Sequence, residues 1–352
     1  MASRIAQRTN RRRRAPGALS AAFFALMSAP SFAHHSSASF DEEAQIALSG
    51  VVTKYEWANP HVYIFLDGVE TASQRRATWE IEGPPPSILK LSGWTPATLA
   101  TGEHVTVSAH PARDAARNAA LLMGVTKADG TTLSRYGNRS IGPETSYKSD
   151  KLPGVWLTLI NDATGRLFDE SLLKDPSVWP LTPKAAAAAQ SFNEDTDLPG
   201  LRCVPYTAPW FLLIADTKEI EQRGAALLIR GEFDGAERTV HLDVASHDGA
   251  EPSLQGHSIG RWDGRALVVD TARFTEHRNG TAWSVPSSSR KHLTERFELG
   301  ADGKSLTYSF VLEDPDYLTR PLSAEAQWVY RPDLTYHAEP CDPVNARRFV
   351  PH

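Results

Sequence analysis

Three histidines near the start of the chain have the types and spacing of a nitrogen-rich metal site. His34 and His35 are adjacent, and His61 follows in the segment "NPH". A histidine at a free N-terminus offers its α-amine and its ring nitrogen as a chelate, and a further imidazole completes the planar arrangement that Cu(II) favours. The pattern predicts a copper site made by these three residues. The alternative is that the first two belong to a frayed terminus and that His61 only hydrogen-bonds the backbone.

The copper chelate requires a chain that begins at His34, and the preceding residues predict such a cut. Four consecutive arginines are followed by "ALSAAFFALM", an apolar stretch too short to span a bilayer. Small residues at Ser31 and Ala33 then fit a cleavage site between Ala33 and His34. Residues 1–33 are therefore predicted to be a signal peptide, and the mature protein is expected to be periplasmic or secreted.

The mature chain expected from this cut is acidic. The first 33 residues contain six arginines and no acidic residue, so 31 basic side chains remain against 42 acidic ones, a formal charge of −11. Such a charge disfavours nucleic acid and anionic lipid as partners. No later segment approaches the roughly 20 apolar residues of a spanning helix, so no membrane span is expected.

A second group of chemically useful residues lies in "GHSIGRW" and in the strand patterns after it. In a β-barrel, strand residues of one parity point inward, so buried charges among them need mutual pairing. A polar interior of this kind either locks the fold or recognises the polar part of a small molecule. The predicted ligand-binding residues are His257, Arg261, Trp262, Asp270, Glu295 and Arg296.

Within this second group, Arg261, Glu295 and Arg296 are expected to share a paired inner network, with His257 nearby. His257 with an aspartate would also form a general acid–base pair if a pocket brought the two side chains within hydrogen-bond reach. Ser258 is a poor nucleophile candidate, because adjacent strand residues point to opposite faces. A structural network, ligand recognition and catalysis all remain open as alternatives.

Two cysteines, Cys203 and Cys341, are present. In an exported chain this number predicts one disulfide rather than a metal site, with two free thiols as the alternative. Closing so long a loop contributes on the order of 4–5 kcal/mol in the chain-entropy model.

The elements that must position these residues are mostly strands. Between Gln45 and Thr126, three strand patterns, a short helical "PSILKL" starting near Pro86 and two more strand patterns follow one another. This is the order of an OB-like five-stranded barrel. In "HVTVSAH" the apolar residues alternate with polar ones, so His104 and His110 are expected to face solvent.

The chain is long enough to predict two domains. Residues 34–126 are expected to form the OB-like domain, 127–151 a polar linker, and 152–352 a second domain with an irregular, proline-rich start and a helix in "TPKAAAAAQSF". Asp-Gly turns then separate successive strand patterns. They predict an up-and-down antiparallel, lipocalin-like barrel of about eight to ten strands, with a β-sandwich as the alternative.

Two parts of the chain resemble uncharacterised exported proteins. The motifs A-H-H-S, E-W-x-N-P-H, W-x-x-E and a closing G-x-x-V-x-V occur here in the order seen in a secreted Gram-negative family known only as a domain of unknown function. The stretch "GHSIGRWDGRALVVDTARF" resembles a second exported group that carries G-H-S-x-G-x-W-x-G-x-x-L-V-V-D-T. The resemblances imply exported β domains and no particular activity.

Together these features predict a periplasmic small-molecule-binding protein with an added copper site. One alternative is an enzyme that acts on a small substrate through the copper ion or His257. Another is an interaction module without a small ligand. The chain contains no P-loop, no C-x-x-C and no H-E-x-x-H motif that would favour an established reaction class.

Overall fold

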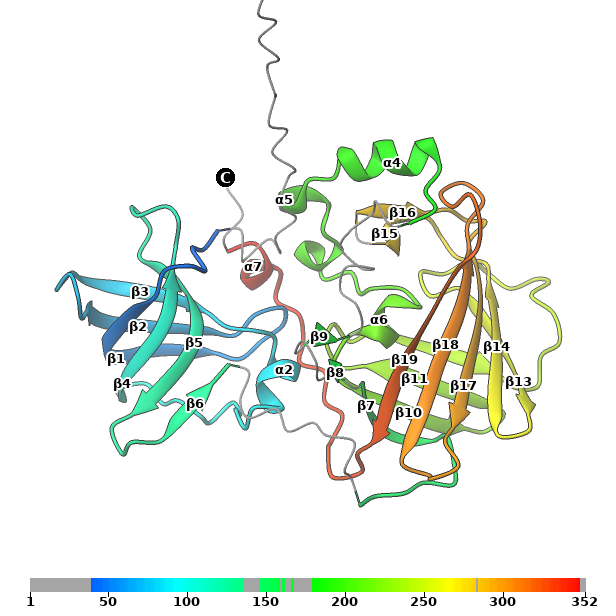
Figure 1. Cartoon of the computed structure of the whole chain (residues 1–352), viewed down its shortest axis with the longest axis horizontal. Helices are drawn as coiled ribbons and strands as arrows, with labels where there is room; N and C mark the ends of the chain where they lie inside the picture. Colours follow the sequence, from blue (N-terminus) through cyan, green and yellow to red (C-terminus); the bar gives the residue numbers. More distant parts are fainter. Residues whose placement is uncertain are drawn as a thin grey trace, which may run out of the picture. The chain divides into compact units, whose positions relative to one another are not determined.

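Two closed β-barrels account for most of the described strands, in agreement with the mainly β fold predicted from the sequence (Figure 1). The structure is a computed structural model of the chain. It describes residues 39–135, 146–158, 160–161, 166–167, 179–282 and 284–348. His34, His35 and the predicted signal peptide lie outside these residues. None of the described helices is long and apolar enough to cross a membrane.

The first barrel has the connectivity of an OB fold. Its elements are β1 (Ile46–Glu56), β2 (Tyr63–Glu70), β3 (Arg76–Glu82), α2 (Pro86–Lys90), β4 (His104–Pro111) and β5 (Ala119–Lys127). The strands pair in the order β3-β2-β1-β4-β5, and a parallel pairing of β3 with β5 closes the barrel. A short strand β6 (Thr132–Ser134), within the stretch predicted as a linker, pairs antiparallel with β5. The first turn of a helix tolerates proline, and α2 begins at Pro86 as predicted.

The fourth strand corrects one prediction about its two histidines. His104 is exposed, as expected, but His110 is buried and its Nδ1 lies 2.7 Å from the carbonyl oxygen of Ala44. The register of β4 against β5 shifts between Ser108 and Ala109. Such a bulge interrupts the alternation of side chains, so Ala109 and His110 are both buried.

The second barrel closes with nine described strands. They are β7 (Gly154–Thr158), β10 (Thr217–Arg223), β11 (Ala226–Gly231), β12 (Glu237–His241), β13 (His257–Asp263), β14 (Ala266–Ala272), β17 (His292–Leu299), β18 (Ser305–Glu313) and β19 (Leu322–Tyr330). From β10 to β19, barrel strands that follow one another in the sequence lie next to each other in the sheet. Strand β7 closes the barrel between β19 and β10. This arrangement agrees with the predicted barrel of sequential strands.

One pairing in the second barrel differs from the antiparallel pattern. Strands β12 and β13 run parallel, with Val240 opposite Ser258 and His241 opposite Ile259. Parallel neighbours need a connection that returns to the starting end of the sheet. Residues 242–256 form this connection between β12 and β13.

Large side chains fill the second barrel. The rings of Phe297 and Trp328 pack against Tyr308, with centroids 5.0 and 5.7 Å away. Helix α6 (Trp210–Leu213) contributes Phe211, and a Cβ at Gly231 would lie only 2.9 Å from this ring. The glycine therefore makes room for a helix that packs into the barrel core.

The remaining elements lie outside the two barrels. They are β8 (Ile160–Asn161) with β9 (Arg166–Leu167), α4 (Pro183–Gln190), α5 (Glu194–Asp197), the 3-10 helix η2 (Pro199–Arg202), the hairpin β15 (His277–Ala282) with β16 (Val285–Ser287), and α7 (Pro343–Ala346). The alanine-rich helix predicted in "TPKAAAAAQSF" is α4, and Thr182 caps it by accepting a hydrogen bond from Ala185 N at 3.2 Å.

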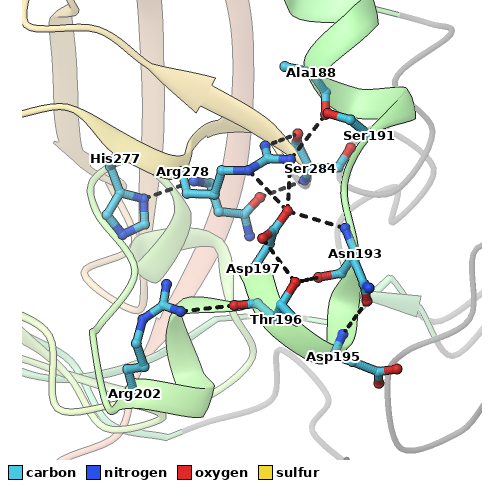
Figure 2. Close-up of polar contacts among 11 residues, drawn as sticks. Ala188, Ser191, Asn193, Asp195, Thr196, Asp197, Arg202, His277, Arg278 and Ser284 are labelled. Atoms are coloured by element: carbon cyan, nitrogen blue, oxygen red, sulfur yellow. Dashed lines mark hydrogen bonds and ion pairs between the residues drawn. The ribbon is translucent and has the colours of Figure 1, made fainter.

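Arg278 fixes α4 and α5 to the β15–β16 hairpin (Figure 2). Its guanidinium pairs with Asp197 at 3.0 Å and donates to the carbonyl oxygens of Ala188 at 3.1 Å and Ser284 at 2.9 Å. One planar side chain thus joins three backbone segments, a task that suits the several donors of arginine.

The predicted disulfide is present. Cys203 and Cys341 are bonded across 138 residues of sequence. The bond fixes the end of η2 to the C-terminal segment that carries α7.

Candidate functional site

His61 of the first barrel has the surroundings of a metal-binding histidine. It precedes β2, and its Nδ1 lies 3.3 Å from the carbonyl oxygen of Gly83 and 3.4 Å from Oε1 of Glu82. Both oxygens are acceptors, so Nδ1 carries the ring hydrogen and Nε2 keeps its lone pair. Metal-binding histidines commonly donate their second nitrogen to a carboxylate or carbonyl in this way. The side chain is 28% exposed, which leaves it open to solvent on one side.

The carboxylate behind His61 is buried and incompletely paired. Glu82 Oε2 accepts a hydrogen bond from the hydroxyl of Tyr63 at 3.0 Å. Within the described part of the chain, no hydrogen-bond donor reaches Oε1 apart from the longer contact with His61. Burial and then the charge of Glu82 raise the pKa of Tyr63, so this hydroxyl keeps its proton. A buried carboxylate is usually paired or bound to a metal, so the poorly paired oxygen favours a cation close to His61.

The rest of the segment "EWANPH" binds the C-terminal segment, residues 339–348. Trp57 Nε1 donates to a glutamate of that segment at 3.0 Å, and Asn59 Nδ2 donates to one of its carbonyl oxygens at 2.8 Å. Glu56 accepts from one of its arginines at 2.7 Å. These contacts give the motif a structural role. The ring of His61 is the part of the motif that these contacts leave unused.

No three His, Cys, Asp or Glu side chains are already arranged to hold a metal ion in the ranges that the structure describes. A metal site at His61 therefore needs ligands from outside these ranges. The other two predicted ligands, His34 and His35, lie there.

The predicted inner network of the second barrel exists, but with other partners. Glu295 is buried and binds Arg238 through two hydrogen bonds of 2.6 and 2.9 Å. It also accepts from the hydroxyl of Tyr308 at 2.7 Å. Arg261 is exposed instead, and Arg296 pairs with two surface carboxylates at 2.8 and 3.0 Å.

The parity of the strands explains this correction. Glu295 and Arg296 are consecutive in β17, so only one of them can point inward. The sequence analysis did not single out Arg238. The pattern "ERTVH" nevertheless carries a signal for it, since alternation places Arg238 on the same strand face as Val240, which is buried. Trp262, predicted to bind ligand, is 49% exposed at the end of β13.

Ser258 is a structural residue. The segment G-H-S-I-G has the G-x-S-x-G spacing of a nucleophile elbow. An elbow needs a sharp turn between a strand and a helix. Ser258 instead lies within β13, is buried, and its hydroxyl lies 2.9 Å from that of Thr271. The motif therefore supplies no exposed nucleophile.

The structure brings His257 and Asp270 to the same outer rim of the second barrel, together with histidines that the sequence did not single out. His247 joins them: its Nδ1 lies 2.9 Å from Nδ1 of His257 and its Nε2 lies 3.1 Å from Oδ2 of Asp270. Nε2 of His292 lies 2.6 Å from the other carboxylate oxygen of Asp270. Loop 242–256 and the strand register, which sequence alone does not reveal, create this cluster.

Two further side chains extend this cluster. His241 stacks its ring on that of His257, with centroids 5.0 Å apart. At the other end, Glu313 Oε2 lies 3.3 Å from Nδ1 of His292. Desolvation, and then the neighbouring His241 and His247, lower the pKa of His257, so its ring is neutral at neutral pH.

The first barrel matches one family model. Residues 23–121 match DUF6152, a family of unknown function. No curated protein matches the chain. The matched range contains β1 to β4, α2, the start of β5 and the three predicted copper ligands. The match supports the resemblance to an uncharacterised domain of unknown function, and it brings no activity with it.

Proposed function

We propose that this is an exported copper-binding protein whose first barrel carries the metal site. His61 is one ligand, through Nε2. After cleavage behind Ala33, the α-amine and the ring of His34 provide a chelate, and His35 can replace either imidazole. The observation that carries this proposal is the position of His61 Nδ1 against Glu82 and Gly83, which leaves Nε2 as the coordinating atom.

The length of the N-terminal segment supports this assignment. Phe40 is buried in one cluster with Tyr63, whose ring centroid lies 6.3 Å from that of His61. Five residues separate His34 from Phe40, and the six steps between their Cα atoms can span up to about 20 Å when extended. A chelate at the mature N-terminus is therefore within reach of His61.

The chemistry of the ligands favours Cu(II). An amine and two imidazoles form a nitrogen-rich set, and Cu(II) binds such sets more tightly than Zn(II) does. The carboxylate of Glu82 fixes the ring of His61, while its unsatisfied oxygen adds negative charge beside the metal. In this proposal Glu82 is a positioning residue and does not touch the ion.

Small-molecule binding by the second barrel and an enzymatic role remain predictions, and the geometry of the described residues gives them no support. The inner charges of Glu295 and Arg238 already neutralise each other, and Tyr308 completes the pairing. A ligand that recognised these groups would first have to separate them.

Copper titration of the correctly processed protein tests the proposed function. We expect the chain that begins at His34 to bind one more Cu(II) per molecule than a form that keeps Ala33. The added alanine moves the free amine away from the ring and leaves every other histidine in place. Calorimetry gives the stoichiometry, and electron paramagnetic resonance reports nitrogen ligands. Equal copper binding by the two forms contradicts the proposal.

Two substitutions locate the site. His61→Ala should remove the same equivalent of copper, whereas His104→Ala, which changes an exposed histidine of the same barrel, should leave it unchanged. Glu82→Gln should weaken copper binding about 10–100-fold, the usual effect of losing an outer-shell partner. A His61→Ala protein with full copper affinity would exclude His61 as a ligand.

A further inference from the structure

The C-terminal segment, residues 339–348, pairs with the backbone of the loop between β1 and β2. The amide nitrogen of Asn59 donates to the carbonyl oxygen of Pro340 at 3.2 Å, and that of Asp342 donates to the carbonyl oxygen of Asn59 at 2.8 Å. These two bonds form a parallel bridge between Asn59 and Cys341. Extended peptides commonly bind to other proteins through main-chain bonds of this kind. The segment is therefore docked on the first barrel in the manner of a bound peptide.

One side chain of the segment covers an acidic and aromatic surface of the first barrel. The guanidinium carbon of Arg348 lies 4.6 Å from the ring centroid of Tyr63 and 5.1 Å from that of Phe65. Its nitrogens donate to Glu80 at 2.9 Å and to Glu56 at 2.7 Å. A planar guanidinium can stack on rings and pair with carboxylates at the same time, which a lysine ammonium cannot. The four partners of Arg348 are called the arginine surface below.

Polar contacts dominate the docking of the segment. Of residues 339–348, Asn345 alone is buried, and its Nδ2 donates to the carbonyl oxygen of His61 at 2.8 Å. Val344 is 74% exposed. Among the described residues, the hydrophobic clusters include none from this segment. The burial of apolar surface, which drives the folding of the barrels, therefore contributes little to holding the segment.

The disulfide decides whether the segment stays docked. The segment makes roughly one hydrogen bond per residue to the rest of the chain. The net gain from one such bond does not exceed the usual entropic cost of fixing one residue. The bond from Cys341 to Cys203 supplies the missing constraint. Both cysteines are partly exposed, so a reductant can reach them.

We propose that the C-terminal segment is a releasable strap over the arginine surface, held closed by the Cys203–Cys341 bond. A dithiol protein opens it by supplying two electrons and two protons. The S–S bond breaks, both cysteines become thiols, and the two sulfurs of the dithiol form a disulfide. The opened surface then binds an arginine on an extended segment of a partner protein. The arginine surface contains none of the proposed copper ligands, so the strap does not depend on the copper site.

Hydrogen exchange of the metal-free protein tests the release. After reduction with dithiothreitol, the amides of Asn59 and Asp342 should exchange about tenfold faster or more, because local opening removes their acceptors. Strand β18 of the second barrel should keep its rates. The double serine variant, Cys203→Ser with Cys341→Ser, should match the reduced chain. Unchanged rates at both amides overturn the strap. Equal acceleration in β18 would show general unfolding and overturns it as well.

A synthetic peptide of residues 339–348 with Cys341→Ser is the probe for the arginine surface. The target is the double serine variant with Arg348→Ala added, which removes the internal competitor, and the melting temperature verifies its fold. The peptide should bind this target about tenfold more tightly than it binds the oxidised natural chain, whose surface is occupied. Equal affinity for the two chains contradicts the proposal.

Two lysine peptides separate arginine recognition from simple charge attraction. Arg348→Lys in the peptide should weaken binding about tenfold, since lysine cannot stack and pair at once. Arg347→Lys is the matched control, because Arg347 donates to the carbonyl oxygen of Leu201 and not to the arginine surface. This control peptide should bind like the natural sequence. Equal affinities of the two lysine peptides would remove the assignment of the surface to arginine.

Discussion

The two barrels differ in what fills them. The core of the first consists of apolar side chains such as Leu48, Ile64 and Trp79. The interior of the second combines aromatic rings with the buried Arg238–Glu295 pair. Barrel diameter grows with strand number, so apolar side chains alone fill the five-stranded barrel, whereas nine strands enclose a wider interior. The wider barrel can therefore accept charged residues, provided that they neutralise each other.

The difference extends to the candidate sites. In the first barrel the polar chemistry is one histidine backed by one buried carboxylate. In the second it is a cluster of histidines around Asp270 on the outside, while the inside is a closed network. The buried pair of the second barrel therefore serves stability, whereas His61 and His257 lie where strands begin.

The largest effect should come from breaking the disulfide that holds the C-terminal segment. Replacing Cys203 and Cys341 by serine removes a cross-link over 138 residues, and we expect a loss on the order of 4–5 kcal/mol in the free energy of unfolding. Urea denaturation of both forms measures it. A loss under about 1 kcal/mol would mean that the unfolded chain is little constrained by the bond.

The contrast between the two interiors predicts the next effect. Glu295→Ala leaves Arg238 buried without its counter-charge, which should cost about 3–5 kcal/mol. Glu298→Ala on the same strand removes an exposed carboxylate and should change stability by less than about 0.5 kcal/mol. Equal effects of the two substitutions would place Glu295 at the surface and remove the difference between the barrels.

A smaller, pH-dependent effect should arise from a buried lysine of the second barrel. Lys291 donates to Thr207 Oγ1 at 3.0 Å and to the carbonyl oxygens of Ala208 at 2.6 Å and Gly280 at 2.8 Å. Burial lowers the pKa of Lys291 from 10.5 to about 7. The unfolded chain therefore holds more protons above pH 7, and the free energy of unfolding should rise between pH 7 and 9 by about 1–3 kcal/mol.

Lys291→Met is the control for this pH dependence. The variant should be less stable, because three acceptors lose their donor, and its stability should change less between pH 7 and 9. Lys218 is also buried, and burial likewise lowers its pKa to about 7, so part of the rise should remain. Identical pH profiles of the variant and the natural chain would show that Lys291 titrates normally.

Local sequence patterns were sufficient for the strand order of the first barrel, the helix start at Pro86 and the disulfide. They worked because each depends on a short-range property: alternation along a strand, the backbone restriction of proline, or the presence of two cysteines in a chain predicted to be exported. Sequential turn signals predicted a barrel of about eight to ten antiparallel strands for the second domain, but they left a β-sandwich open and did not indicate the parallel pairing of β12 with β13.

Tertiary structure alone decided which residues meet. Alternation shows that Glu295 and Arg296 face opposite ways, but only the register across the four strands β12, β13, β14 and β17 brings Glu295 to Arg238. A bulge in β4 buries His110, although the alternation of the strand predicts an exposed side chain. The path of loop 242–256 places His247 beside His257. Sequence determined the types of chemistry available, because these are properties of side chains. The fold determined the pairings, because contacts between distant segments depend on register and loop paths that no local pattern contains.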